Sequence, residues 1–242
     1  MALLGGILGL AGLILAYVGG RRTRTPEAHL WTLALAALAW WGISESLIVA
    51  PVDPKIRLLG VRAQVIGVVG IAPFLLLGAI QYSGTVLRLR LRYRIGIFLI
   101  PALTVLLAFS NDRHHLIWST LELRPDGALQ IAYGPWFWLH TLFAIMAFLV
   151  ALAFMFPVLI HVSRESLPVI AGLFLATALI FAAFLLSLYD PSYAYRSAPW
   201  RGASAVMLGL AAVLLGLVFQ TLPSFHPIPI ARSLIVETMS EY

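Results

Sequence analysis

The chain has 242 residues, of which 61% are hydrophobic and only 11% are charged. A soluble globular domain has about 45–50% apolar and about 25% charged residues. This composition therefore excludes a fully solvated surface and predicts a protein that exposes much of itself to lipid. The net charge of +6 does not indicate nucleic-acid binding, because the basic residues cluster at the ends of apolar runs, where phospholipid headgroups accept them. The absence of cysteine excludes disulfides and thiolate chemistry.

Seven apolar runs approach the roughly 20 residues that a helix needs to cross the hydrocarbon core. They predict an all-α, polytopic membrane protein built as a seven-transmembrane helix bundle. The expected spans are residues 2–17, 28–50, 58–81, 95–109, 135–160, 167–188 and 202–220. The fourth run is short, and Tyr93 with the stems of nearby arginines can extend it. Pro73, Pro101 and Pro157 lie inside spans and are expected to kink them.

The distribution of basic residues predicts the orientation. The first run is not a cleavable signal peptide, because its positive charges follow the apolar region instead of preceding it. If the spans alternate, nine arginines fall on one side: Arg21, Arg22, Arg24, Arg88, Arg90, Arg92, Arg94, Arg164 and Arg232. By the positive-inside rule this side is cytoplasmic, which places the N-terminus outside and the C-terminus in the cytoplasm. The stretch "RLRLRYR" (88–94) alternates like a strand, but a headgroup anchor is the favoured interpretation.

Three ionisable residues are expected at one level near the outer membrane face. Glu45, Arg62 and His140 each lie about 7–8 Å inside a span end, at the helical rise of about 1.5 Å per residue. Such groups normally face the bundle interior and pair. One interpretation is a Glu45–Arg62 ion pair that joins spans two and three, with His140 hydrogen-bonded nearby. The other is an outward-facing polar chamber that receives a ligand or a proton.

Two polar segments adjoin this level, "NDRHHLIW" (111–118) and "YGPWFWLH" (133–140). The first segment either forms the wall of the chamber or is a solvated turn between two helices. In the second segment, Trp136 and Trp138 either belong to the chamber or anchor the chain at the lipid headgroups. The candidate sensing residues are Glu45, Arg62, Asn111, His114, His115, Trp118, Trp138, His140 and Asp190. Histidines beside carboxylates can also titrate near neutral pH, so pH sensing at the outer face is a further alternative function.

Metal and cofactor chemistry receive little support. His114, His140 and Glu45 are weak candidate ligands, but adjacent histidines diverge by about 100° on a helix, so no metal site is predicted. The single lysine, Lys55, is expected in an outer loop, which excludes a retinal Schiff base inside the membrane. No other cofactor is indicated. Neither a phosphate-binding glycine loop nor a nucleophile elbow occurs, and we identify no catalytic residues in the chain.

These segments, in this order, resemble the N-terminal seven-transmembrane region of bacterial and archaeal sensor histidine kinases. The outer loop is similar to "N-x-x-H-H-L-x-W", and span five opens like "Y-G-P-x-F-W-x-H". The turn "QYSGTVLRLRLRYR" (81–94) and the tail "FHPIPIARSLIVETMSEY" (225–242) are similar to further segments of that family. The resemblance covers nearly the whole chain.

The resemblance implies a sensor domain at 1–222 and a cytoplasmic exit segment at 223–242, in which Pro229, Arg232 and Glu237 transmit the signal. A PAS or kinase module, which this sequence does not include, would follow and carry out ATP-dependent histidine phosphotransfer. The resemblance also implies a homodimer and a response regulator as partners. The expected location is the inner or plasma membrane, with the lipid bilayer as the immediate contact.

The leading hypothesis is therefore a membrane sensory input domain that passes a stimulus through span seven to a cytoplasmic output module. A small-solute transporter or channel is one alternative, but it would need polar groups that continue inward from His140, and the inner halves of these spans are nearly free of charge. A structural subunit of a larger membrane complex is the other alternative.

Overall fold

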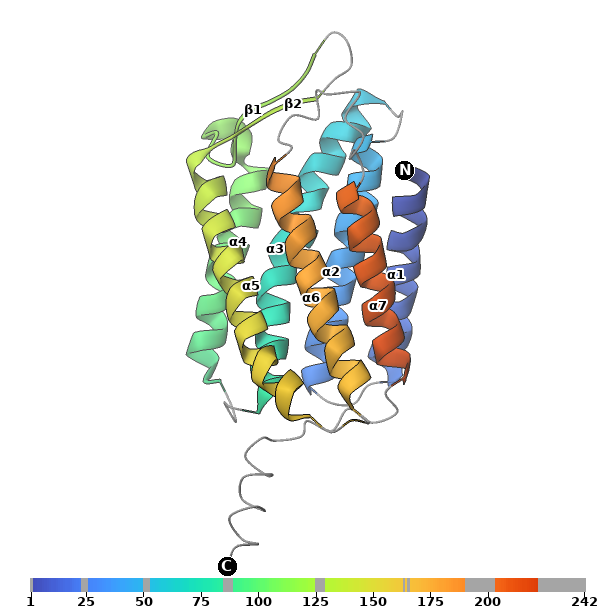
Figure 1. Cartoon of the computed structure of the whole chain (residues 1–242). Helices are drawn as coiled ribbons and strands as arrows, with labels where there is room; N and C mark the ends of the chain where they lie inside the picture. The colour runs from blue at the N-terminus through green and yellow to red at the C-terminus, as the bar shows by residue number, and fades with distance from the viewer. Residues whose placement is uncertain are drawn as a thin grey trace, which may run out of the picture.

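Seven α-helices make up most of the part of the chain that the computed structural model describes, which is residues 2–22, 26–49, 53–84, 89–124, 129–162, 164, 166–189 and 203–221. The helices are α1 (Ala2–Arg22), α2 (Pro26–Val49), α3 (Pro54–Ser83), α4 (Leu91–Phe109), α5 (Pro135–His161), α6 (Leu167–Tyr189) and α7 (Ala203–Thr221). They run alternately up and down in one bundle (Figure 1). The predicted helical bundle is thereby confirmed.

Five of these helices are long and apolar enough to cross a membrane, judged by length and composition. They are α2, α3, α4, α5 and α6, and α1 and α7 contribute the shorter apolar segments Gly9–Val18 and Val206–Val218 among the described residues. These helices support a multi-pass membrane protein. The number of spans and the orientation stay predictions.

Six helices form a closed ring in the order α1, α2, α3, α5, α6 and α7, in which α7 returns to α1. Helix α4 packs outside this ring against α3 and α5, at the left edge of Figure 1. Large apolar side chains on the outward faces, such as Leu99, Leu142, Leu175 and Leu210, are exposed. In water such a surface would aggregate, whereas in a bilayer it faces lipid.

Local signals set the helix limits where the structure extends beyond the predicted spans. Helix α3 begins four residues earlier than expected, because Asp53 accepts a hydrogen bond from the backbone N–H of Lys55 at 2.7 Å and Pro54 follows as the first helical residue. Helix α4 begins at Leu91, so Tyr93 is part of the helix. Helices α3, α4 and α5 continue through their internal prolines.

In the described part of the chain, a two-stranded antiparallel hairpin adds to the predicted helical architecture. Strands β1 (Trp118–Leu123) and β2 (Leu129–Tyr133) pair so that Trp118 lies opposite Tyr133, with an irregularity between Trp118 and Thr120. A short 3₁₀ turn, η1 (Asn111–Arg113), joins α4 to this hairpin. We call the end of the bundle that carries it the hairpin end and the opposite end the distal end (Figure 1).

The buried side chains form two apolar clusters. The larger one runs through the bundle and includes Trp31, Leu75, Phe148 and Leu215. The smaller one attaches the hairpin to the ends of α2, α3 and α4 and consists of Ile48, Val61, Ala108, Ile117, Trp118, Leu129 and Ile131. The hairpin is therefore a packed part of the bundle, and the site described next lies beneath it.

Candidate ligand-sensing site

Asn111 holds the loop between α4 and β1 in shape. Its side-chain Oδ1 accepts hydrogen bonds from the backbone N–H groups of Ile117 at 2.9 Å and Trp118 at 3.1 Å, and its Nδ2 donates to the carbonyl oxygen of Trp118 at 2.9 Å. Asn111 is only 4% exposed. Buried backbone groups must find partners, so this one amide sets the direction in which β1 leaves the loop.

The start of α5 closes against the same loop at Gly134. The backbone N–H of Gly134 donates to the carbonyl of Ile117 at 2.8 Å, and that of Trp136 donates to the carbonyl of Leu116 at 3.0 Å. A Cβ on Gly134 would lie 2.6 Å from the carbonyl oxygen of His115 and closer still to that of Leu116. Only glycine permits this approach, and the two polar segments of the sequence are therefore bonded to each other.

The two adjacent histidines have structural positions in this loop. His114 accepts a hydrogen bond at Nδ1 from the backbone N–H of Leu116 at 3.1 Å, and its Nε2 lies 3.0 Å from the hydroxyl of Ser110. His115 is exposed and has a positive φ of 54°, which a non-glycine residue adopts at a cost. In the described part of the chain, no group of three or more His, Asp or Glu side chains could hold a metal ion.

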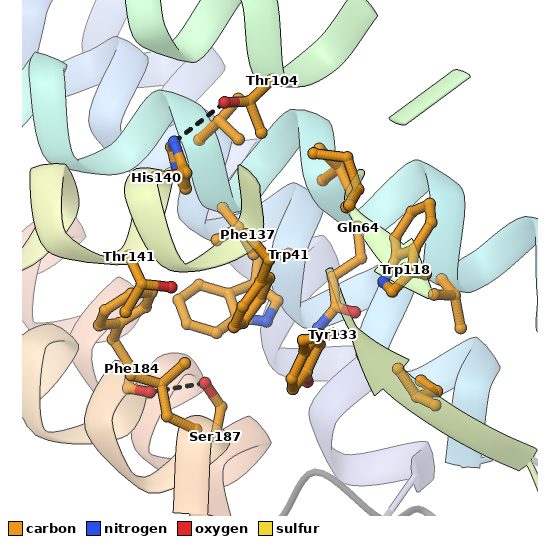
Figure 2. Close-up of a pocket in the computed structure, with 17 residues that line it drawn as sticks. Trp41, Gln64, Thr104, Trp118, Tyr133, Phe137, His140, Thr141, Phe184 and Ser187 are labelled. Carbon is orange, nitrogen blue, oxygen red and sulfur yellow. Dashed lines mark hydrogen bonds between the residues drawn. The ribbon is translucent and has the colours of Figure 1, made fainter. Parts of the chain in front are cut away.

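A cavity of about 90 Å³ lies beneath the hairpin, where α2, α3, α4, α5 and α6 converge (Figure 2). Aromatic rings form much of its wall, and its polar side chains come from four different helices. The lining residues are Trp41, Val61, Gln64, Val65, Val68, Val69, Thr104, Ile117, Trp118, Ile131, Tyr133, Phe137, His140, Thr141, Phe184, Ser187 and Leu188. A mostly apolar cavity with a few convergent polar groups is the usual form of a small-molecule site.

Thr104 fixes the orientation of the His140 ring. The Thr104 hydroxyl donates to the carbonyl of Ile100 at 2.8 Å and accepts from Nε1 of Trp136 at 2.9 Å. Nδ1 of His140 lies 3.2 Å from the same oxygen, the contact dashed in Figure 2. Thr104 of α4 is therefore in hydrogen-bonding distance of two side chains of α5, those of Trp136 and His140.

Trp41 lies near the middle of the lining in Figure 2 and packs edge-on against Phe184 of α6, with ring centroids 6.5 Å apart. Helix α3 can approach this part of α2 because residue 67 is glycine. A Cβ on Gly67 would lie 2.7 Å from the backbone nitrogen of Trp41 and equally close to the carbonyl oxygen of Ala37. This close helix contact places the indole at the cavity.

The predicted Glu45–Arg62 ion pair is wrong. Arg62 instead donates to both carboxylate oxygens of Asp112, at 2.7 and 2.9 Å, and this salt bridge ties α3 to the start of the loop. Glu45 is buried and accepts a hydrogen bond from Nε2 of Gln64 at 2.5 Å. Two residues at the same depth on neighbouring helices can point in different directions, and here they do.

The structure separates the residues predicted for sensing and for signal transmission. Trp118 and His140 line the cavity. Asn111 shapes the loop above it, and Glu45 contacts the lining residue Gln64. Arg62, His114, His115 and Trp138 lie outside the lining, with Trp138 56% exposed beside the stacked rings of Tyr133 and Phe137. The sensing candidate Asp190 lies outside the described residues, and so do the predicted transmission residues Pro229, Arg232 and Glu237.

Several lining residues were missed by the sequence reasoning, chiefly Trp41, Gln64, Thr104 and Phe184. Gln64 carried a signal, because it is an uncharged polar side chain inside an apolar run and such residues tend to face other helices. Trp41 and Phe184 carried none, since they are apolar residues in helices that are apolar on all sides.

Comparison with known proteins assigns the chain to a family. The family model described as the N-terminal 7TM region of histidine kinase matches residues 2–229, which is almost the full length. A search of the curated proteins finds no match. The segments that meet at the cavity lie within the matched region. The chain belongs to the family of N-terminal seven-transmembrane regions of histidine kinases.

Proposed function

We propose that the chain is the sensory input domain of a membrane histidine kinase and that the cavity beneath the hairpin is where the stimulus acts. The observation that carries the proposal is the convergence of five helices and both strands on one cavity. A molecule bound there would contact elements from distant parts of the chain at once. It could therefore favour one packing of the bundle over another, which is what a sensor requires.

The proposed orientation places the hairpin end outside the cytoplasm. Arg21, Arg90, Arg92, Arg94 and Arg164 belong to the end of α1, the start of α4 and the connection between α5 and α6, all at the distal end. The hairpin end has five described basic residues of its own, but they are spread over three segments and accompanied by the acidic residues Asp53, Asp112 and Glu122. This asymmetry supports a cytoplasmic distal end, and the inner or plasma membrane is the proposed location.

The proposed route of transmission runs from the cavity to α7. Trp41 of α2 contacts Phe184 of α6, and α7 packs against α6, α1 and α2. A change in the packing of these helices would reach the segment after α7, where Pro229, Arg232 and Glu237 are expected to pass it to a kinase module. Homodimerisation and phosphotransfer to a response regulator belong to this proposal as the expected partners of such a module.

Joining the chain at residue 242 to a cytoplasmic histidine-kinase module and measuring autophosphorylation in vesicles tests this proposal. Val65→Phe fills the cavity, because Val65 lines it. Ile66→Phe is the matched control, since its neighbour Ile66 is exposed on the outer face of the same helix. We expect Val65→Phe to change the autophosphorylation rate by at least about fivefold, the lower end of typical coupling between sites, and Ile66→Phe to leave it unchanged. Equal autophosphorylation rates in the unaltered protein, Val65→Phe and Ile66→Phe would contradict the proposal.

A further inference from the structure

The start of α4, at the distal end of the bundle (Figure 1), carries a cluster of arginines. Four arginines fall within the seven residues of "RLRLRYR" (88–94), and the structure describes three of them, Arg90, Arg92 and Arg94. No Asp or Glu occurs in residues 54–111, which include α3 and α4, or in α5, the other helix against which α4 packs. The helices around the cluster therefore supply no counter-charge to it.

The position of the cluster makes its positive charge unfavourable for the isolated chain. The first turn of a helix carries partial positive charge on its free N–H groups, and it is stabilised by acidic residues. At α4 the capping residue is Arg90, whose side chain makes no capping hydrogen bond, and the first turn contains no acidic residue. An anion at this point would interact favourably with the arginines and with the free N–H groups together.

The contacts of the individual arginines leave their charge uncompensated. In the described part of the chain, none of the three has an ion pair. The guanidinium of Arg92 lies 4.8 Å from the ring centroid of Tyr93 and donates to its hydroxyl at 3.0 Å, but a neutral phenol does not balance a charge. Nε of Arg94 is buried without a hydrogen-bond partner among the described residues. Arg90 and Arg92 are exposed and can reach a molecule outside the bundle.

An exposed apolar row continues from the cluster along α4. Ile95, Leu99 and Leu106 follow Arg92 after three, seven and fourteen residues, a spacing that places all four on one side of the helix. In a bilayer such a row contacts acyl chains, while the arginine at its end lies at the level of the headgroups. A phospholipid with a negative headgroup matches both parts of this surface, whereas a soluble anion matches only the arginines.

The distal half of α4 has little other support. The buried residues of this helix are Pro101, Thr104 and Ala108, and none precedes Pro101. In the distal half, the ring of Phe98 contacts that of Phe74 in α3, with centroids 5.3 Å apart. A lipid bound at the start of the helix would therefore add a contact where the protein supplies few.

We propose that the start of α4 binds the headgroup of an anionic phospholipid and that this lipid holds the distal half of α4 against the ring of helices. The phosphate lies against Arg90 and Arg92 at the free N–H groups of the first turn, and an acyl chain follows the exposed row. Thr104 of the same helix contacts Trp136 and His140, so the position of α4 is linked to the cavity wall. The proposal requires a membrane surface at the distal end and does not depend on the sensory role of the cavity.

The test compares phosphatidylglycerol with phosphatidylcholine of identical acyl chains, because the two lipids differ in net charge. The full chain in detergent is titrated with each lipid, and bound lipid is measured by native mass spectrometry. The double variant Arg90→Gln with Arg92→Gln removes two charges of the cluster. The double variant Arg21→Gln with Arg164→Gln is the matched control, since both of these arginines are exposed at the same end of the bundle.

We expect phosphatidylglycerol to bind more tightly than phosphatidylcholine. The variant at 90 and 92 should weaken phosphatidylglycerol binding about 30-fold, from roughly fivefold for each arginine near an anionic lipid surface, and the control should weaken it less than about fivefold. Glycerol phosphate, which has the phosphate without acyl chains, should not displace the lipid. Spin labels at Ile95 of α4 and Ile160 of α5, both exposed, should give a narrower distance distribution in phosphatidylglycerol nanodiscs than in phosphatidylcholine nanodiscs.

Equal affinities for the two lipids would overturn the proposal, and so would an equal loss in the control variant, which would indicate a general attraction to the whole distal end. Displacement of the lipid by glycerol phosphate would identify a soluble anion as the ligand and would also overturn it. Identical distance distributions in the two kinds of nanodisc would contradict the effect on α4. The proposed function is decided separately, by the autophosphorylation measurement with Val65→Phe.

Discussion

Replacing Asn111 by alanine should destabilise the protein substantially, although Asn111 lies in a loop. The substitution removes three hydrogen bonds of 2.9, 2.9 and 3.1 Å and leaves the N–H groups of Ile117 and Trp118 and the carbonyl of Trp118 without this partner. Ile117 is 2% and Trp118 4% exposed. Each buried group left unsatisfied costs about 1–3 kcal/mol. Because water can enter beside the cavity, we take the lower limit and expect a loss of about 3 kcal/mol.

This loss can be measured by thermal unfolding in detergent, followed by tryptophan fluorescence. For soluble domains of this length, 1 kcal/mol corresponds to a change in Tm of about 2–4 °C, so a decrease of about 6–12 °C is expected. Asn111→Asp has almost the same shape but places a second oxygen opposite the carbonyl of Trp118, so it should also lower Tm. Ser119→Ala is the control in the same hairpin, because the Ser119 hydroxyl is exposed and its hydrogen bond to Tyr133 is long, at 3.5 Å.

The reasoning would be refuted if Asn111→Ala unfolded within about 0.5 kcal/mol of Ser119→Ala, the range of ordinary surface substitutions. Such a result would mean that the loop finds other partners for its backbone groups. The link between the loop and the cavity wall would then have to be abandoned.

Three further predictions concern the same end of the bundle. Gly134→Ala should lower stability by about 2 kcal/mol or more, because the added Cβ overlaps the backbone of His115 and Leu116. Gly96→Ala in α4, where a Cβ meets nothing within 4 Å, should be neutral or stabilising by up to about 1 kcal/mol. Equal thermal stability of the two variants would contradict the close approach of Gly134 to the loop. Asp112→Asn should lower the free energy of unfolding by less than about 1 kcal/mol, because the Arg62 and Asp112 side chains are 34% and 71% exposed. A larger loss in the same assay would contradict the weak contribution expected of an exposed salt bridge. His115→Gly should be tolerated and His115→Val should destabilise, since a β-branched residue resists a positive φ; the reverse order would mean that the side chain of His115 matters more than its backbone.

The helices were accessible from the sequence because the physical requirement is simple. A bilayer demands about 20 apolar residues with all backbone groups bonded internally, and the apolar runs of this chain satisfy that demand visibly. The predicted ends of the helices were less accurate where a capping residue sets the first turn. At Asp53 the cap and the following proline begin α3 earlier than hydropathy suggests. The hairpin was missed although the sequence carries signals for it. Polar and apolar residues alternate in "TLEL" (120–123) and in most of "LQIAY" (129–133), and the turn residues "PDG" (125–127) stand between them.

The site was only partly accessible for a geometric reason. The rise per residue gives the depth of a side chain, and this placed Glu45, Arg62 and His140 at one level. Depth does not give the direction around the helix axis. That direction decides that His140 lines the cavity, whereas Arg62 reaches Asp112. In a helix that is apolar on every side, no periodicity reveals which face is inward, and Trp41 was overlooked for this reason.

The proposed orientation is open to a direct check because the chain contains no cysteine. A single cysteine at Ser119, which is exposed on the hairpin, should react in intact cells with a maleimide that cannot cross the membrane. A cysteine at Arg90, exposed at the distal end, should react only after the cells are opened. The opposite pattern would invert the topology.

The central claim is that a change in the cavity alters the packing of helices at the distal end, and a distance measurement tests it most directly. Spin labels at Ile14 of α1 and Ile160 of α5, both exposed and both in the distal half of their helices, report the separation of these helices. We predict that Val65→Phe shifts this distance by about 1–2 Å or more, the scale of helix shifts in known switches, and that Ile66→Phe does not. Identical distance distributions in both variants and in the unaltered protein would contradict the claim.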